Sequence, residues 1–247
     1  MTKKNTEKIF GLHAVRHVFK NDFSRVMEMW VQQGLHSAKL EALLKQAEQQ
    51  GIAIQSVPKK TLDNLSDNGH HQGILIRCKA SQIQSSLENI IASSKTPFFL
   101  VLDEVQDPHN LGACLRTADA AGIDAVIVPK NQACQLTGTV HQVACGATVP
   151  FISVTNLART LRWLQEQGVW LVGTEAESQS TLFETNLTGS LAFVLGAEGR
   201  GLRRLTRETC DLLVRIPMSG TVESLNVSVA TGVCLYEAVR QRSVQAV

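Results

Sequence analysis

Three short polar segments of this 247-residue chain carry side chains that packing alone does not explain. The first, DPHNLGACLRTADAAG at 107–122, places Asn110 where a helix is expected to begin and Arg116 among small and apolar residues. Asparagine is a good helix N-cap, whereas a lone arginine on such a helix either meets an anion or points into solvent. This segment alone leaves a structural and a functional interpretation open.

The second segment, LGAEGRGL at 195–202, is a glycine-rich turn that holds one acid, Glu198. Its glycines follow the order G-x-x-G-x-G, which is not the G-x-G-x-x-G fingerprint of dinucleotide-binding enzymes. A nucleotide-dependent dehydrogenase is therefore disfavoured. Because glycine lets backbone amides approach a ligand closely, the turn is a candidate ligand site, with a plain turn as the alternative.

The third segment, IPMSGTVESLNVSVATGVCLYEAVRQR at 216–242, has Ser224 and Asn226 in a polar loop before a helix of small residues. Either side chain could cap that helix and do nothing more. Taken singly, none of the three segments decides a function.

Strands and helices alternate through the part of the chain that positions these segments. Apolar runs such as FFLVLDEV, DAVIVP and LAFVLGAEG predict strands that are buried on both faces of a parallel sheet. The fold class is therefore α/β, with a mostly parallel sheet covered by helices on both sides. In such sheets ligands bind outside the carboxyl ends of the strands, where all three segments are expected to lie.

The chain is expected to divide into a small α/β domain at 1–79, a Ser- and Gln-rich linker at 80–96 with at most one helical turn, and a larger domain at 97–247. In the first domain, residues 39–50 predict a helix that ends at Gly51, and IAIQSV and GILIRCKA predict strands. This domain has 12 Lys and Arg against 7 Asp and Glu, a net charge of +5 within a chain whose total is +2. Such an excess is a hint of nucleic-acid binding, although solvated surface lysines are the commoner explanation.

Composition excludes several classes of protein. Hydrophobic residues make up 44% and charged residues 19% of the chain, as in ordinary globular proteins. No apolar run approaches the roughly 20 residues that span a bilayer, and no secretory leader is recognisable, so we expect a cytoplasmic protein without membrane contact. The six cysteines and seven histidines show no C-x-x-C or H-E-x-x-H spacing, which predicts no bound metal.

Together the segments read D-P-x-N-L-G-A-x-x-R-x-A-x-A-x-G, L-G-x-E-G-x-G and I-P-M-x-G-x-x-x-S-L-N-V-S-x-A. In order and spacing they resemble the three motifs of the SpoU (TrmH) branch of the SPOUT RNA methyltransferases. FGLHAVRHVF at 10–19 and HHQGILIRCK at 70–79 resemble the substrate-binding domain of that branch. The resemblance implies a trefoil-knotted C-terminal domain, S-adenosyl-L-methionine as cofactor, a homodimer, and 2′-O-methylation of a guanosine ribose in the 23S ribosomal RNA.

The resemblance also implies roles for single residues. Backbone groups around Gly196, Ile216 and Leu225 match the cofactor contacts of the family, and five polar side chains match those near the reacting atoms: Asn110, Arg116, Glu198, Ser224 and Asn226. Arginine stays protonated in proteins, so Arg116 is expected to stabilise a developing alkoxide or to bind a phosphate rather than act as a base.

Two alternatives stay open at this point. A tRNA 2′-O-ribose methyltransferase of the same branch is the main rival, although such enzymes often lack the long N-terminal domain. A catalytically silent RNA-binding relative is the other, and the presence of all five polar residues argues against it.

Overall fold

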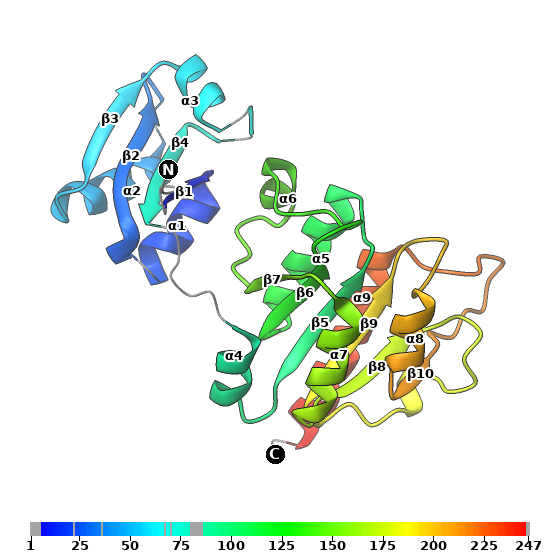
Figure 1. Ribbon diagram of the computed structural model, residues 1–247. Helices are drawn as coiled ribbons and strands as arrows, with labels where there is room; N and C mark the ends of the chain where they lie inside the picture. Colours follow the sequence, from blue (N-terminus) through cyan, green and yellow to red (C-terminus); the bar gives the residue numbers. More distant parts are fainter. Residues whose placement is uncertain are drawn as a thin grey trace. The chain divides into compact units, whose positions relative to one another are not determined.

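The computed structural model describes residues 6–21, 23–35, 37–66, 68–69, 71–79 and 86–245. These residues form two compact units, Met1–Gln84 with Thr137–Gly146, and Ser85–Leu136 with Ala147–Val247. Each unit is built around its own β-sheet (Figure 1).

The first unit has a four-stranded sheet in the order β1-β4-β2-β3. Strands β1 and β2 run antiparallel to β4, and β3 runs parallel to β2. Its elements along the chain are β1 (Thr6–Phe10), α1 (Leu12–Asn21), η1 (Phe23–Arg25), β2 (Val26–Gln32), α2 (Ala38–Gln49), β3 (Ala53–Val57), α3 (Lys59–Leu65) and β4 (Ile74–Lys79).

Helix α2 shows why the predicted elements form in this unit. The Ser37 side chain accepts the N–H of Leu40 and caps the helix. Leu40, Leu43 and Ala47 form its buried face, as the spacing in the sequence predicts. Gly51 then adopts a φ of 72°, which favours glycine and ends the helix.

The second unit has a six-stranded sheet in the order β10-β8-β9-β5-β6-β7, and every neighbouring pair is parallel. The α/β class and the parallel sheet predicted from the apolar runs are confirmed. Its elements are α4 (Leu87–Ser93), β5 (Phe98–Asp103), α5 (Pro108–Ala120), β6 (Ala125–Pro129), β7 (Phe151–Val154), α7 (Leu157–Glu166), β8 (Trp170–Thr174), η2 (Leu182–Glu184), β9 (Leu191–Gly196), α8 (Arg204–Thr209), β10 (Leu212–Val214) and α9 (Val227–Gln245). Helix α6 (Gly138–Val143) follows β6 in the chain but is grouped with the first unit.

Helices cover both faces of this sheet. Phe99 and Val101 of β5 pack in one core with residues of α4 and α7. On the opposite face, the guanidinium of Arg242 in α9 lies 4.0 Å from the ring centre of Phe98. Helix α5 packs alongside α9. The loops that carry the three polar segments follow the carboxyl ends of strands β5, β9 and β10.

Helix α4 lies inside the segment 80–96, where the sequence predicts a linker with at most one helical turn. Leu87 and Ile90 of this helix are buried in the core beneath the parallel sheet. Their burial explains why α4 is longer than expected, because the helix contributes apolar surface to the second unit. The part of the expected linker at 80–85 lies outside the described residues.

None of the helices within the described residues is long and apolar enough to cross a lipid bilayer.

Candidate active site

The glycine-rich turn begins where strand β9 ends, beside the end of β5. Gly196 is the register partner of Asp103. A Cβ atom on Gly196 would overlap the carbonyl group of Gly201, so only glycine allows the chain to fold back this closely. The N–H of Gly201 donates to the carbonyl of Ala197 at 3.0 Å and closes the turn.

A cavity of about 480 Å³ lies against this turn. Its lining combines the turn with the end of β8 and with the loop between β10 and α9. Five of the residues singled out from the sequence line it: Gly196, Glu198, Ile216, Ser224 and Leu225. The second and third polar segments therefore meet at one cavity, within the range of about 300–1,000 Å³ that is usual for small-molecule sites.

Asn226, Asn110 and Glu198 form a chain of side-chain hydrogen bonds that joins all three segments. Asn226 Nδ2 donates to Asn110 Oδ1 at 3.0 Å, and Asn110 Nδ2 donates to Glu198 Oε2 at 3.5 Å. The Oδ1 of Asn226 accepts the backbone N–H of Ser228 at 2.9 Å. Because a backbone N–H can only donate, it fixes the orientation of both amides: Asn226 donates to Asn110, and Asn110 donates to the Glu198 carboxylate.

Asn226 also caps helix α9, since its Oδ1 accepts the N–H of the second helical residue. Both interpretations of this residue hold together: one end of the amide caps the helix and the other reaches Asn110. The hydrogen bond to Ser228 makes Asn226, rather than Ser224, the cap of α9. Ser224 is exposed and lines the cavity.

Of the two interpretations that the sequence left open for Asn110, the structure does not show the helix cap. Asp107 is the N-cap, and its carboxylate accepts the N–H groups of His109 and Asn110 at 3.1 and 3.2 Å. Pro108 then occupies the first helical position, where its missing N–H costs nothing. Asn110 stands in the first turn of the helix, and its side chain is turned to Asn226 and Glu198.

Arg116 does not line the cavity of its own chain. It is an exposed residue on α5, six positions after Asn110. Six helical residues correspond to a rotation that leaves the two side chains about 120° apart around the helix axis. The structure thus brings together Asn110, Glu198, Ser224 and Asn226, and leaves Arg116 on another side of α5.

Sequence reasoning missed an ion pair that flanks the turn. Asp103, the last residue of β5, is buried, and its Oδ1 accepts Nε and Nη2 of Arg203 at 2.7 and 2.6 Å. The acid at the end of a fully apolar strand was the available signal, because a carboxylate is rarely buried unless it is paired. Further charged side chains of the lining that the sequence did not single out are Glu175, Glu177, Arg200, Arg215 and Glu223.

The cysteines offer no reactive thiolate next to the cavity. Burial raises the pKa of Cys210 to about 12, that of Cys234 to about 12 and that of Cys114 to about 11. A thiol with such a pKa stays protonated at neutral pH. Within the described part of the chain, no three His, Cys, Asp or Glu side chains are grouped as metal ligands.

Comparison with protein families assigns the two parts of the chain separately. Residues 97–236 match the model of the SpoU rRNA Methylase family. Residues 8–84 match a family model described as RNA 2′-O ribose methyltransferase substrate binding.

Curated relatives match over nearly the full length. The chain is 54% identical over 243 residues to the 23S rRNA (guanosine-2′-O-)-methyltransferase RlmB of Shewanella oneidensis, covering 97% of this chain and 99% of that protein. It is 53% identical over 242 residues to the RlmB of Escherichia coli K12, covering 96% of this chain and 100% of that protein.

Solved structures show the same architecture. A crystal structure of an RNA 2′-O ribose methyltransferase superposes with a TM-score of 0.80 at 26% identity, over 97% of this chain and 90% of that one. The SpoU methyltransferase AviRb from Streptomyces viridochromogenes, solved in complex with AdoMet, has a TM-score of 0.80 at 22% identity, over 97% of this chain and 92% of that one.

Proposed function

Because this chain belongs to the SpoU rRNA Methylase family, we propose that it transfers a methyl group from S-adenosyl-L-methionine to the ribose 2′-hydroxyl of a guanosine in 23S rRNA. The observation that carries the proposal is the hydrogen-bonded chain Asn226–Asn110–Glu198 at the edge of the cavity. It joins one residue from each of the three motifs into a single site. Relatives named for this reaction match the chain from end to end.

The cavity fits S-adenosyl-L-methionine. Gly196 and the turn that follows it bring backbone close to the cavity without side chains between. The lining has four carboxylates against two guanidinium groups, a net negative charge that suits a cationic sulfonium; these residues are Glu175, Glu177, Glu198, Glu223, Arg200 and Arg215. We assign the holding of the cofactor to backbone groups around Gly196, Ile216 and Leu225. When bound, the cofactor supplies a methyl group activated by the sulfonium.

The remaining polar residues orient the ribose for an in-line displacement. Glu198 and Ser224 line the cavity, and Asn226 orients the Asn110 amide that donates to Glu198. Holding a hydroxyl in line with a methyl group removes much of the entropic barrier. The charge that develops on the 2′-oxygen needs a cation, and Arg116 is the residue of the first motif that supplies one.

A second copy of the chain provides this arginine in our proposal, because Arg116 is exposed outside the cavity of its own chain. Helix α9 offers the surface for a homodimer. Val229 and Tyr236 are 51% and 50% exposed, and Val233 lies between them on the same helical face. An apolar stripe of this kind is typical of a contact between protein chains.

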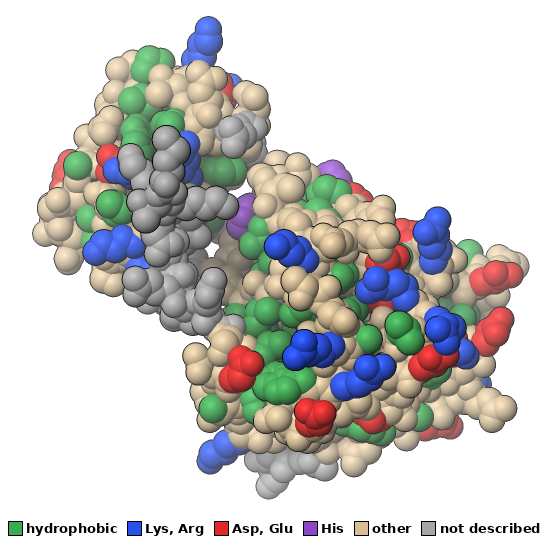
Figure 2. Space-filling model, in the orientation of Figure 1, with side chains coloured by type: hydrophobic (Ala, Val, Ile, Leu, Met, Phe, Trp, Pro, Cys, Tyr) green, Lys and Arg blue, Asp and Glu red, His purple; other side chains and the backbone are tan. Residues whose placement is uncertain are grey.

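RNA selection is assigned to residues 1–79, with 80–96 as the connection and 97–247 as the methyltransferase domain. The net charge of +5 in the first part and the family model matched at 8–84 support this division. In the second unit many cations are neutralised. Figure 2 shows acidic side chains interspersed among the Lys and Arg of one face, and Arg204 pairs with Glu208 and Arg207 with Glu175.

We place the enzyme in the cytoplasm without a bound metal. None of the six cysteines, all of which lie within the described residues, forms a disulfide, as is usual in a reducing compartment. The trefoil knot of the methyltransferase domain stays a prediction from the family.

Mass-spectrometric mapping of 2′-O-methyl groups in the RNA of a strain that lacks this gene tests the proposal. One guanosine of the 23S rRNA is expected to lose its 2′-O-methyl group and to regain it when the gene is restored. Loss of a methyl group from a tRNA instead would identify the rival tRNA enzyme. Calorimetry that detects no S-adenosyl-L-methionine binding would identify a silent RNA-binding relative.

A further inference from the structure

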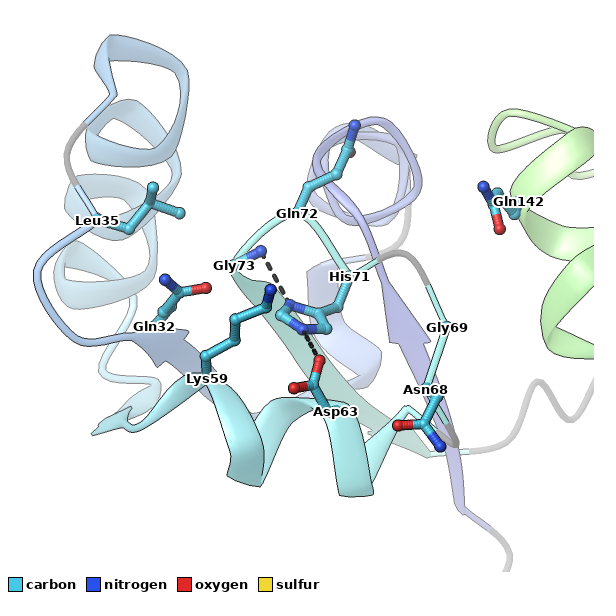
Figure 3. A pocket seen from close by; sticks show the side chains of 10 residues that line it. All are labelled: Gln32, Leu35, Lys59, Asp63, Asn68, Gly69, His71, Gln72, Gly73 and Gln142. Atoms are coloured by element: carbon cyan, nitrogen blue, oxygen red, sulfur yellow. Dashed lines mark hydrogen bonds and ion pairs between the residues drawn. The ribbon is translucent and has the colours of Figure 1, made fainter.

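A second cavity lies in the first unit, away from the methyltransferase motifs. It measures about 590 Å³ and is lined by the end of β2, by α3 and by the turn that leads into β4 (Figure 3). This turn leads into the HHQGILIRCK segment at 70–79, which lies in the part of the chain to which we assign RNA selection without yet naming what it contacts. Its lining is mostly polar and includes the side chains of Gln32, Lys59, Asp63 and His71.

His71 forms the floor of this cavity and holds Asp63 in place. The imidazole is buried, at 4% exposure. Its Nδ1 accepts the N–H of Gly73 at 3.0 Å, so the proton lies on Nε2, which donates to Asp63 Oδ1 at 2.9 Å. One carboxylate oxygen of Asp63 is thereby engaged, and Figure 3 shows the other on the side of Lys59.

The walls of the cavity are preformed. A Cβ on Gly73 would overlap the side chain of Leu35, and a Cβ on Gly69 would overlap the ring of Phe10. The Oε1 of Gln72 accepts the N–H of Leu12 at 2.9 Å and ties the turn to α1.

The lining combines one cation, one anion and an imidazole with four amides: Gln32, Asn68, Gln72 and Gln142. Lys59 and Asp63 stand four residues apart on α3, and therefore on the same helical face. The carboxylate of Asp63 would repel a ligand that is only anionic. A single apolar neighbour, Leu35, is too little for a lipid chain. A nucleobase edge carries donors and acceptors together, which matches this set.

We propose that this cavity binds one unpaired guanine of the RNA substrate. Asp63 accepts hydrogen bonds from the N1–H and N2 amino groups, and Lys59 donates to O6, the donor and acceptor pattern that distinguishes guanine. Unpaired bases in RNA loops are read in this way, on their Watson–Crick edges. The inference rests on the proposed function, since it takes RNA to be the substrate.

Binding of an unmethylated 23S rRNA transcript to the full chain tests the inference. Lys59→Ala and Asp63→Asn are each expected to weaken binding by about tenfold. Asparagine at 63 still accepts the hydrogen bond of His71, so the floor of the cavity stays intact. Lys60→Ala is the matched control: it removes the adjacent lysine of α3, which does not line the cavity, and is expected to change affinity less than about twofold.

Two outcomes would overturn the guanine site. Asp63→Asn that binds RNA as tightly as the wild type, or more tightly, would mean that the cavity meets only phosphate or no RNA. Equal losses in Lys59→Ala and Lys60→Ala would mean a diffuse electrostatic contact. Gln32→Ala removes a lining side chain of β2 and leaves the His71–Asp63 contact untouched. This variant is also expected to weaken RNA binding, which tests the cavity from a second element.

Failure of the proposed function is detected separately. Affinity for S-adenosyl-L-methionine and methyl transfer at saturating RNA are expected to stay at the wild-type level in all four variants, with a raised KM for RNA in the cavity variants. A wild-type chain that binds the transcript but methylates nothing would contradict the proposed function. The four affinities would still decide the guanine site.

Discussion

Asp103 and Arg203, which are 100 residues apart in the chain, hold the two ends of the glycine-rich turn together. The Oδ2 of Asp103 accepts the backbone N–H of Arg203 at 3.1 Å, and its Oδ1 accepts the guanidinium at 2.7 and 2.6 Å. Asp103 is also the register partner of Gly196. The residue that ends β5 therefore contacts the chain immediately before and after the segment that carries Glu198.

Replacing Asp103 with asparagine is expected to disturb this segment. Asparagine keeps the shape but removes the charge that Arg203 faces. Because Arg203 is 40% exposed and also pairs with Glu104 at 3.3 Å, the loss should be about 1–3 kcal/mol, the usual range for a hydrogen bond to a charged group. We expect a lower free energy of unfolding together with weaker binding of S-adenosyl-L-methionine, measured by denaturant unfolding and calorimetry. Arg204→Ala is the control, because its pair with Glu208 is exposed and should contribute under about 1 kcal/mol. Wild-type cofactor affinity in Asp103→Asn would exclude a positioning role for the pair.

Gly196→Ala is expected to abolish cofactor binding. The new methyl group would occupy the space of the Gly201 carbonyl, so the turn must open. Gly189→Ala adds the same methyl group at an exposed position where it meets no atom within 4 Å. Calorimetry and thermal unfolding of both variants separate the local clash from a general effect of removing a glycine. A Gly196→Ala protein that binds the cofactor normally would contradict the close approach.

Arg116→Ala is expected to lower the rate of methyl transfer by about 10²–10³, the usual loss when one oxyanion donor is removed. Arg116→Lys keeps the charge without the planar fork and should also be strongly impaired. Affinity for S-adenosyl-L-methionine should stay unchanged, because Arg116 does not line the cavity. Single-turnover assays on 23S rRNA measure this, with the exposed Arg162→Ala of α7 as control. Wild-type turnover in Arg116→Ala would end the catalytic assignment.

Mixing two inactive variants tests whether the arginine comes from the partner chain. A dimer of one Arg116→Ala chain and one Glu198→Ala chain contains one intact site if Arg116 acts across the interface, and none if it acts within its own chain. Random exchange should then restore about a quarter of wild-type activity, because half of the dimers are mixed and each has one active site of two. No recovery, with dimer exchange verified, would place Arg116 in its own site.

Asn226→Asp separates the two roles of Asn226. Aspartate still accepts the N–H of Ser228, and its charge is favourable at a helix start, so stability should stay within about 1 kcal/mol of the wild type. It cannot donate to Asn110, so methyl transfer should fall by about 10². Asn156→Ala is the converse control: it removes the cap of α7, where Asn156 Oδ1 accepts the N–H of Arg159, and should cost about 1 kcal/mol with normal activity.

Local pattern was sufficient to predict the centre of the sheet but not the contacts of the site. The run FFLVLDEV predicts β5, and all six of its residues are buried. The sequence DLLVRIPM predicts a longer strand than the three residues of β10. The observed strand is short because Arg215 donates its backbone N–H to the carbonyl of Ser180 instead of continuing the sheet. Asp107 before Pro108 was a readable cap signal that the neighbouring Asn110 obscured.

The hydrogen bond between Asn226 and Asn110 lies beyond such reasoning, since 116 residues separate the two in the chain. The pattern of apolar residues places each segment at the end of its strand. It does not say which side chains meet there, because that depends on the order of strands in the sheet. Only the resemblance to a family indicated that these residues act together.

The same long separations determine when catalytic competence appears during refolding. Glu198 is 88 residues from Asn110, and Asn226 is 116 residues from it, so the site closes only after several large loops have been fixed. Each closure costs chain entropy before any hydrogen bond compensates for it, which delays contacts of high sequence separation. Helical circular dichroism should return early in refolding, since α2 and α7 are capped by residues three positions away, Ser37 at Leu40 and Asn156 at Arg159. Methyl transfer should return only in the slowest phase, when the parallel sheet has acquired its full strand order.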